Sequence, residues 1–405
     1  MNLRFAAAVI GVLAVLSIGQ SVGISTPRIS QGQPAGTVPF ELAAMSGTGG
    51  NKVFKVIPVG NGPANLVVDY ANGEVYVADT GRNPPPVEPS YVSVISGSTD
   101  KVVKTVPVGD TPGGVGSDVP AVDYMNGDIY VDNENSNTVS VISGSTNTVV
   151  ATIPVGTGQK ALAFDYANGD IYVSNDVSGT VSVIYGASNT VIATIQVGTN
   201  PEGIAVDGAN GDIYVANTGS GSVSVISGQT NTVVATIPVG TYPFGVSVDY
   251  LNGDIYVTNH GSNTVSVISD ATNTVVATVP VGNFPYVAPA VDYANGNIYV
   301  VNVNSNSVSV ISGSTNRVVA TIPVGSNPLD VATYTAKGLD YIYVANELSD
   351  SVSVISGFTN TVVATIPVGS HFDGLGGPNG IAVDYQNGEV YVTSFYSNTV
   401  TAIKV

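Results

Sequence analysis

The sequence predicts an all-β fold, a single β-propeller of four-stranded antiparallel blades, on three observations. A Val-Gly pair closes eight successive copies of one unit, at Gly60, Gly109, Gly156, Gly198, Gly240, Gly282, Gly325 and Gly369. Each unit holds four short runs rich in β-branched residues, separated by turn residues. No run has the periodicity of a helix of useful length. Repeats with two hairpins each are typical of propeller blades, whereas the coils of a linear β-solenoid, the alternative, are usually shorter.

The unit at residues 199–240 shows the expected elements in order. Asn210-Gly211 lies between two β-prone runs and is the strongest short signal for a hairpin, because Asn and Gly both accept a positive φ. A Gly- and Ser-rich turn separates the second and third runs. The four strands are expected at Gly203–Asp207, Ile213–Ala216, Val223–Ser227 and Val233–Val239.

The strand count predicts eight blades. Val53–Val59 matches only the fourth strand of the unit, and seven complete sets of four strands follow it. The chain then ends with a first, second and third strand, at Ile381–Asp384, Val390–Thr393 and Val400–Ile403. We therefore expect the N-terminal strand to complete the last blade and close the ring, which removes free strand edges.

The strand sequences also carry a family resemblance. The runs IYVAN (Ile213–Asn217) and IYVTN (Ile255–Asn259), followed by VSVIS and TNTVVATIPVG, resemble the YVTN-type β-propeller repeat over residues 51–405. That family is common in archaeal cell-surface and surface-layer proteins. The resemblance implies a propeller, with seven blades as the alternative to eight because family propellers often have seven. Some related propellers are lactonases or lyases, but no residue set of theirs can be carried over to this sequence.

The N-terminus has the layout of an export signal. One basic residue, Arg4, precedes the apolar run Phe5–Gly19, and small residues follow it. The run is short for a bilayer span, so residues 1–23 are predicted to be a signal peptide, with an uncleaved N-terminal anchor as the alternative. Residues 24–51 are expected to form a flexible linker, and residues 52–405 the propeller. The predicted location is therefore extracellular or at the cell surface, with membrane contact only through an uncleaved N-terminal segment.

Composition excludes several kinds of site. The chain of 405 residues has 11 Lys and Arg and a net charge of -18, so nucleic acid is excluded as a partner. Cysteine is absent, and the two histidines are His260 and His371, so we predict no metal site and no cofactor. The acidic turn Asp165–Asp170 has enough oxygens for calcium, but hydrogen bonds to turn amides are the simpler interpretation.

One side of the ring is expected to vary between repeats and to carry any ligand site. The first–second and third–fourth turns barely vary, whereas the second–third turns and the connections between blades do, and insertions in repeats gather on the binding face. We call the second side the variable face. Its predicted ligand-binding residues are Tyr242, Phe244, Phe284, Tyr286, His371, Phe372, Asp373, Phe395 and Tyr396. Exposed aromatic rings make large contacts at low entropic cost, while drift in unconstrained loops is the alternative.

The function predicted from these patterns is not enzymatic. The sequence favours an exported interaction, adhesion or envelope protein that binds a protein or glycan at the cell surface. The alternative is a lactonase- or lyase-like propeller enzyme with carboxylates lining the central channel. The acid pairs Asp132 with Glu134 and Glu347 with Asp350 are candidates for acid–base partners, but we interpret them as solvated loop acids. No catalytic residue is predicted.

Overall fold

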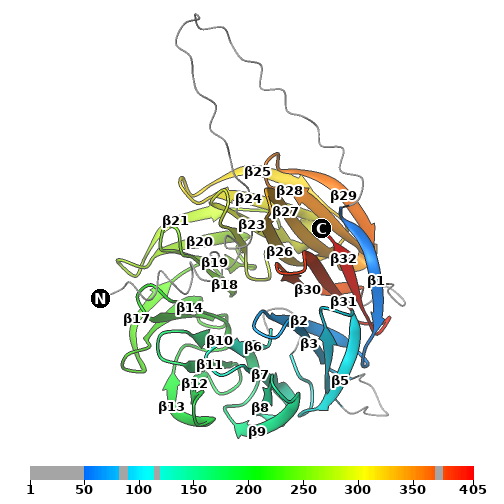
Figure 1. Ribbon diagram of the computed structural model, residues 1–405. Helices are drawn as coiled ribbons and strands as arrows, with labels where there is room; N and C mark the ends of the chain where they lie inside the picture. Colours follow the sequence, from blue (N-terminus) through cyan, green and yellow to red (C-terminus); the bar gives the residue numbers. More distant parts are fainter. Residues whose placement is uncertain (1–49, 82–89, 114–118, 370–376) are drawn as a thin grey trace, which may run out of the picture. The chain divides into compact units, whose positions relative to one another are not determined.

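The computed structural model describes residues 50–81, 90–113, 119–369 and 377–405. Within them, 32 strands form eight separate four-stranded sheets, so the prediction of eight blades is confirmed and seven is wrong. Figure 1 shows the eight sheets arranged as a ring, with the first strand of each blade at the centre and the fourth at the rim. The propeller, residues 51–405, is one compact unit. The predicted signal peptide and nearly all of the predicted linker lie outside the described residues.

The first four blades follow the chain order after the N-terminal strand β1 (Lys52–Pro58). Blade 1 consists of β2 (Pro63–Asp69), β3 (Glu74–Asp79), β4 (Tyr91–Ser96) and β5 (Lys101–Pro107). Blade 2 consists of β6 (Ala121–Asp123), β7 (Asp128–Asn133), β8 (Thr138–Ser143) and β9 (Thr148–Pro154). Blade 3 consists of β10 (Gln159–Asp165), β11 (Asp170–Asn175), β12 (Thr180–Tyr185) and β13 (Thr190–Gln196). Blade 4 consists of β14 (Pro201–Asp207), β15 (Asp212–Asn217), β16 (Ser222–Ser227) and β17 (Thr232–Pro238).

The remaining blades repeat this pattern. Blade 5 consists of β18 (Pro243–Asp249), β19 (Asp254–Asn259), β20 (Thr264–Ser269) and β21 (Thr274–Pro280). Blade 6 consists of β22 (Ala290–Asp292), β23 (Asn297–Asn302), β24 (Ser307–Ser312) and β25 (Arg317–Pro323). Blade 7 consists of β26 (Pro328–Ala336), β27 (Leu339–Asn346), β28 (Ser351–Ser356) and β29 (Thr361–Pro367). Blade 8 consists of β30 (Pro378–Asp384), β31 (Glu389–Ser394), β32 (Thr399–Lys404) and β1.

Among the described residues, three short 3-10 helices follow second strands, η1 (Glu134–Ser136), η2 (Val303–Ser305) and η3 (Glu347–Ser349). In the described part of the chain, no helix has the length and apolar character needed to cross a membrane.

The core lies between neighbouring blades. Tyr214 and Val225 of blade 4 pack with Val246 and Ile255 of blade 5 in one buried cluster, and similar clusters join the other neighbours. The two middle strands of each blade are buried on both faces, which explains the apolar IYV run of the second strand and the alternation of small Ser with Val and Ile in the third. Burial stabilises the ring by roughly 1.5–3 kcal/mol for each Val or Ile that is removed from water.

A repeated tyrosine–asparagine hydrogen bond also joins neighbouring blades. The tyrosine of the IYV run is fully buried, and its hydroxyl donates to a side-chain oxygen in the third–fourth turn of the next blade, at 2.5–3.1 Å. The acceptor is usually an Asn with a positive φ, as at Asn273, where φ is 52°. At the ring closure Tyr343 donates to Asn51, the residue just before β1. Two sequence motifs of the repeat, IYV and TN, are therefore the two halves of one contact.

We expect Tyr214→Phe to lower the free energy of unfolding by about 1 kcal/mol, because it removes one hydrogen bond and leaves the ring in place. Asn273→Ala leaves the Tyr214 hydroxyl buried without its acceptor, so its cost should be larger, about 1–3 kcal/mol. Urea unfolding of both variants and the parent protein measures the difference. Equal stability of all three proteins would contradict this role for the contact.

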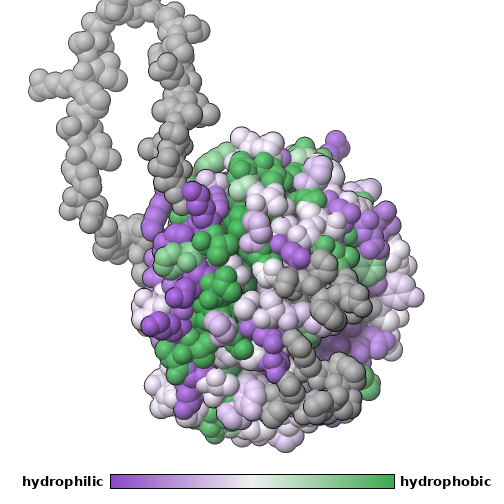
Figure 2. All heavy atoms as spheres, turned by 90° about the vertical axis from the view of Figure 1, so that its right-hand side faces the viewer, coloured by the Kyte–Doolittle hydropathy of each residue, from purple (hydrophilic) through white to green (hydrophobic). Residues whose placement is uncertain are grey.

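The ring closes as predicted. β1 pairs antiparallel with β32, with Val53 opposite Ile403 and Ile57 opposite Val400. Each outer strand carries a bulge, whose extra residue is Phe54 in β1 and Val234 in β17. Both side chains are exposed, and Figure 2 shows apolar patches among polar residues on the rim near β1. Bulges twist a free edge away from further pairing, which protects the outer strands.

The first–second turns have the predicted Asn-Gly geometry. In blade 4, Asp207 Oδ1 accepts from the Ala209 amide at 2.9 Å, and Asn210 Oδ1 accepts from the Asp212 amide at 2.7 Å. Gly211 has φ 77°, which is strained for residues with a side chain. The oxygens of the corresponding turn at Asp165–Asp170 bond turn amides in the same way. The interpretation of these acids as turn formers is therefore confirmed.

Candidate functional site

Five rings gather on the variable face between blades 5 and 6. We call Tyr242, Phe244, His260, Phe284 and Tyr286 the aromatic cluster. Tyr242 precedes β18 and Phe244 lies in it, His260 follows β19, and the last two rings lie in the connection between β21 and β22. Phe244 and Tyr286 stack with ring centroids 4.0 Å apart, and His260 lies 4.7 Å from Phe284 and 5.4 Å from Tyr242. The structure thus brings together the four aromatic residues predicted from consecutive connections, with His260 among them.

Two of these rings sit on strained backbone. Tyr242 has φ 52° and Phe284 has φ 60°, in the left-handed region. The corresponding position before the inner strand is Asn200 in blade 4 and Asn327 in blade 7, residue types that tolerate this conformation. A large aromatic residue with positive φ is uncommon and costs about 1–3 kcal/mol, and such strain gathers at functional sites.

The cluster is partly open to solvent. Tyr242 is 55% exposed, whereas Phe244 is only 6% exposed, so the expectation that all four rings are exposed is wrong for Phe244. Phe244 is buried because Tyr286 covers it, stacked on its ring. Burial also lowers the pKa of His260 below its ordinary value of 6.5, so its imidazole is neutral at pH 7. The accessible surface is therefore an uncharged aromatic platform.

Replacing a strained ring should separate stability from binding. We expect Tyr242→Asn to raise the free energy of unfolding by about 1 kcal/mol, because Asn accepts the positive φ that blades 4 and 7 already use. The same change removes an exposed ring and should weaken binding of a ligand on the platform by about 1–3 kcal/mol. Thermal unfolding and ligand titration of the variant measure the two effects. A Tyr242→Asn protein that is less stable than the parent would show that the ring is a core residue.

A cluster of charged residues on blades 2 to 4 lies next to the aromatic cluster. We call Asp132, Glu134, Lys160, Asp176 and Glu202 the carboxylate–lysine cluster. Asp132 lies near the end of β7 and Glu134 in η1, Lys160 and Glu202 are the second residues of β10 and β14, and Asp176 follows β11. Lys160 Nζ lies 2.7 Å from Glu134 Oε1. The charges of Lys160, Asp176 and Glu134 all act on Glu202, whose pKa burial raises to about 7.

Asp132 is a buried acid, not a solvated one, which corrects the interpretation made from the sequence. Its side chain belongs to β7 and is fully buried, and burial raises its pKa to about 7. The same strand position holds a hydroxyl in three other blades, at Ser174, Thr258 and Thr393. Ser174 and Thr393 donate to the carbonyl of the second inner-strand residue of the next blade, and Thr258 donates to the carbonyl of Tyr286, which precedes β22, at 2.6–3.3 Å.

Asp132 lies in blade 2, and the equivalent carbonyl of the next blade, blade 3, is the carbonyl of Lys160. Among the described residues, neither carboxyl oxygen of Asp132 has a hydrogen-bond partner of normal geometry. A carboxyl group can donate as those hydroxyls do only when it is protonated, which agrees with its raised pKa. Asp132 is therefore mostly protonated below about pH 7, next to the Lys160–Glu134 ion pair.

The two clusters form one continuous arc. Glu202 and Phe244 occupy the same position on the neighbouring inner strands β14 and β18. These strands pack so closely that a Cβ on Gly203 would collide with the Phe244 carbonyl. Thr218 Oγ1, just beyond β15, donates to the Pro243 carbonyl at 2.5 Å and fixes blade 4 to blade 5. Equivalent residues of blades 3 to 6 therefore lie side by side along the arc. They are Lys160, Glu202 and Phe244, each the second residue of its inner strand, and Tyr286, which precedes β22.

The remaining predicted site residues are not part of this arc. Phe395 and Tyr396 of blade 8 contact each other at a centroid distance of 5.2 Å. In the described residues no ring contact joins this pair to the aromatic cluster. His371, Phe372 and Asp373 lie outside the described residues. Glu347 begins η3 and accepts a hydrogen bond from Asn327. The described part of the chain holds no group of three or more His, Asp or Glu placed to bind a metal.

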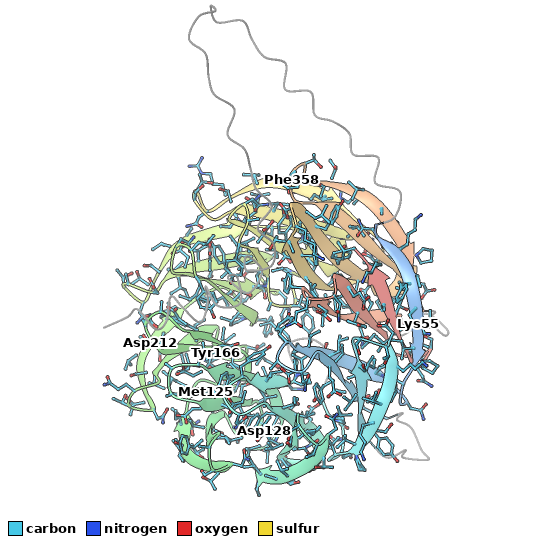
Figure 3. All side chains as sticks on the ribbon, in the orientation of Figure 1. Lys55, Met125, Asp128, Tyr166, Asp212 and Phe358 are labelled. Carbon is cyan, nitrogen blue, oxygen red and sulfur yellow. The ribbon has the colours of Figure 1, made fainter. Side chains whose placement is uncertain are left out.

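A second aromatic feature lies on the uniform side, where the sequence interpretation saw only turn geometry. We call it the tyrosine collar: in six blades the residue after the last Asp of the inner strand is a tyrosine, namely Tyr70, Tyr124, Tyr166, Tyr250, Tyr293 and Tyr385. Neighbours in the collar lie 5.9–6.3 Å apart between ring centroids. Figure 3 shows Tyr166 at the inner end of its blade, near the centre of the ring. Its signal in the sequence was the recurring Asp-Tyr pair.

Comparison with known proteins agrees with the repeat. The NHL repeat model matches residues 199–226, which lie in blade 4. The chain is a β-propeller repeat protein. No curated protein matches its sequence. The YVTN type and the archaeal surface-layer link are not confirmed by these findings.

Two solved structures share the fold. The first, described as dihydro-heme d1 dehydrogenase NirN in complex with DHE, has a TM-score of 0.67 and 12% identity, and covers 86% of this chain and 78% of that chain. The second, hydrazine synthase from Kuenenia stuttgartiensis, has a TM-score of 0.57 and 20% identity, and covers 74% of this chain and 97% of that chain. At these identities the likeness shows a common fold.

The comparison corrects one prediction. The prediction that the protein is not an enzyme is contradicted by the likeness in fold to the structure described as a dehydrogenase. The physical reason for the error lies in the inner strands, because Lys160 and Glu202 were not considered and Asp132 was assigned to a solvated loop. Nothing found supports the non-catalytic cell-surface role that the sequence favoured.

Proposed function

We propose that the protein is an enzyme that carries out general acid–base chemistry on the variable face of the propeller. The observation that carries the proposal is Glu202, a partly buried carboxyl with a pKa of about 7 beside Lys160. A group that titrates near the working pH exchanges protons most effectively, since it is present in both forms. Perturbed carboxyls beside a specific charge partner are typical of active sites.

We assign a different role to each of three residues of the arc. Glu202 is the proposed proton acceptor and donor. The Lys160 ammonium, held by Glu134 at 2.7 Å, is placed to stabilise negative charge that develops on a substrate oxygen. Asp132 is fully buried and acts as a positioning residue, since below about pH 7 its carboxyl is protonated and adds no second negative charge beside the ion pair.

The neighbouring platform defines the substrate class. Tyr242 and the rings behind it offer a flat, uncharged surface for stacking, which suits the face of a small ring compound. Lys160 and Glu202 would then meet a carbonyl or carboxylate on that ring. A lactone or a uronic-acid unit of a glycan has this combination, so the activity we propose is lactonase- or lyase-like. Residues 1–23 support the further proposal that this activity is exported.

A substrate panel tests the proposal. The parent protein, Glu202→Gln and Lys160→Met are each tested on two classes of substrate. Hydrolysis is measured with lactones, and formation of the unsaturated product is measured with uronate oligosaccharides. We expect turnover of at least one class, and a loss of 10²–10⁴-fold in rate for Glu202→Gln. Asp212→Asn is the matched control and should keep the parent rate, because Asp212 begins β15 at the first–second turn of blade 4, on the uniform side of the propeller. No turnover across the panel, or a Glu202→Gln protein that is as active as the parent, would overturn the proposal.

A further inference from the structure

The tyrosine collar is interrupted in blade 4. The residue that follows Asp207 is Gly208, where six other blades carry a tyrosine. Tyr166 and Tyr250 stand on either side of this position, in blades 3 and 5. They are 48% and 42% exposed, whereas Tyr70 and Tyr124, which have ring neighbours on both sides, are less exposed. We call Tyr166, Gly208 and Tyr250 the collar gap.

The gap has the width of one ring. Consecutive collar rings lie about 6 Å apart. From the repeat of the ring we infer two such steps between Tyr166 and Tyr250, and Gly208 of blade 4 supplies no side chain between them. Blade 7 also lacks a collar tyrosine, but there the Tyr334 ring stacks on Tyr385 at 5.7 Å and occupies part of the space. The collar gap is thus the place where two tyrosine faces are left open to a ligand.

The surroundings of the gap are negative. Lys160 is the only Lys or Arg in residues 159–282, which make up blades 3 to 5, and it belongs to the variable face. The buried carboxyls of Asp165 and Asp207 lie directly before Tyr166 and Gly208, and their charges act on Tyr250. On this side Lys404 donates to the Asn387 carbonyl and the Lys337 ammonium lies near Gly388, so both belong to the surroundings of the blade 8 turn, remote from blade 4.

We propose that the collar gap binds an organic cation of about one ring in size, such as a quaternary ammonium group. Two tyrosine faces attract a cation through their ring quadrupoles, and nearby carboxylates add to the attraction. A neutral group of equal size should bind more weakly than the cation. It makes the same apolar contact with the two rings but gains no electrostatic attraction. This site lies on the opposite side of the ring from the proposed active site and does not depend on it.

The substitution Gly208→Tyr tests the gap directly. In the collar the tyrosine hydroxyl donates to the carbonyl of the preceding blade, as from Tyr250 to Val206 at 2.9 Å and from Tyr70 to Val383 at 2.8 Å. A tyrosine at position 208 is therefore expected to donate to the Phe164 carbonyl and fill the gap without disturbing the fold. Thermal unfolding checks that the variant is at least as stable as the parent.

The probes are choline and its neutral isostere 3,3-dimethylbutan-1-ol, titrated into the full chain by calorimetry and ligand-observed NMR. We expect choline to bind at least tenfold more tightly than the alcohol. Gly208→Tyr should abolish choline binding, and Tyr166→Ala should weaken it at least tenfold. Tyr70→Ala, in the distant part of the collar, is the matched control and should bind as the parent does. Equal binding of both probes, no choline binding by the parent, or unchanged choline binding by Gly208→Tyr would overturn the inference.

Discussion

The protein is expected to unfold at a higher temperature at pH 5 than at pH 8. Asp79 and Asp132 are at most 1% exposed, and burial raises the pKa of each to about 7 in the folded state. In the unfolded chain an Asp titrates near its ordinary value of about 3.9. Between roughly pH 4 and 7 the folded state therefore binds more protons than the unfolded state, so stability is complete below this window and falls as the pH rises through it.

The size of the effect is large because many groups act in the same direction. One such carboxyl changes the free energy of unfolding by up to about 1.4 kcal/mol per pH unit within its window. Burial raises the pKa of several other acids as well, among them Glu202 and Asp340, each to about 7. His260 acts in the opposite direction below its ordinary pKa, but it is one group against many. Thermal unfolding between pH 4 and 9 measures the slope, and higher stability at pH 8 than at pH 5 would contradict it.

Asp79→Asn gives this prediction a matched variant. The position is an asparagine in six other blades, where its amide donates to a serine, as from Asn217 to Ser224 at 3.0 Å. Ser93 occupies the same place beside Asp79, with 2.6 Å between their oxygens. We expect Asp79→Asn to match the parent at pH 5, where Asp79 is protonated, and to be more stable by about 1–3 kcal/mol at pH 8.

Removal of β1 should have the second large effect. A protein lacking residues 51–60 loses the strand that pairs with β32 and the Asn51 acceptor of Tyr343. The freed β32 then presents unpaired amides and carbonyls, with Val400 and Ala402 no longer covered by Ile57. An exposed apolar strand edge is a template for pairing with another chain, so we expect aggregation at micromolar concentration.

The control for this deletion is a shorter protein that starts at residue 50 and keeps β1. It should remain monomeric at concentrations at which the deletion variant aggregates, as measured by light scattering during size-exclusion chromatography. A monomeric deletion variant with the parent's unfolding temperature would show that the ring does not depend on its N-terminal strand.

The fold could be predicted from the sequence because each local signal repeats eight times in the same order. Strand positions in the unit at 199–240 agree with β14 to β17 to within one or two residues. The closing strand was predictable as well, since Val53–Val59 lacks the three strands that should precede it. The tyrosine–asparagine contact could not be predicted, because its two partners are about 60 residues apart and meet only once the blades are stacked.

The candidate site was predictable only in part. Tyr242 and Phe284 stood out because an aromatic residue replaces the Gly, Asn or Thr of other repeats, and the structure places both rings against His260. Glu202 and Lys160 were missed because a charged residue within an inner strand has no distinct signal until the strand is known to line the centre of the ring. Asp132 was misjudged because the sequence does not distinguish the last residues of a strand from the first residues of a loop. Its burial also depends on packing against blade 3.

The most direct measurement is the titration of the carboxyl groups of the carboxylate–lysine cluster. Carbon-detected NMR of protein labelled at Asp and Glu carboxyls, compared with Asp132→Asn and Glu202→Gln, assigns the two signals. The account predicts that Glu202 and Asp132 both titrate near pH 7, and that Lys160→Met moves the Glu202 value upward because the positive charge beside it is lost. Titration of both groups below pH 5, with no response to Lys160→Met, would contradict it.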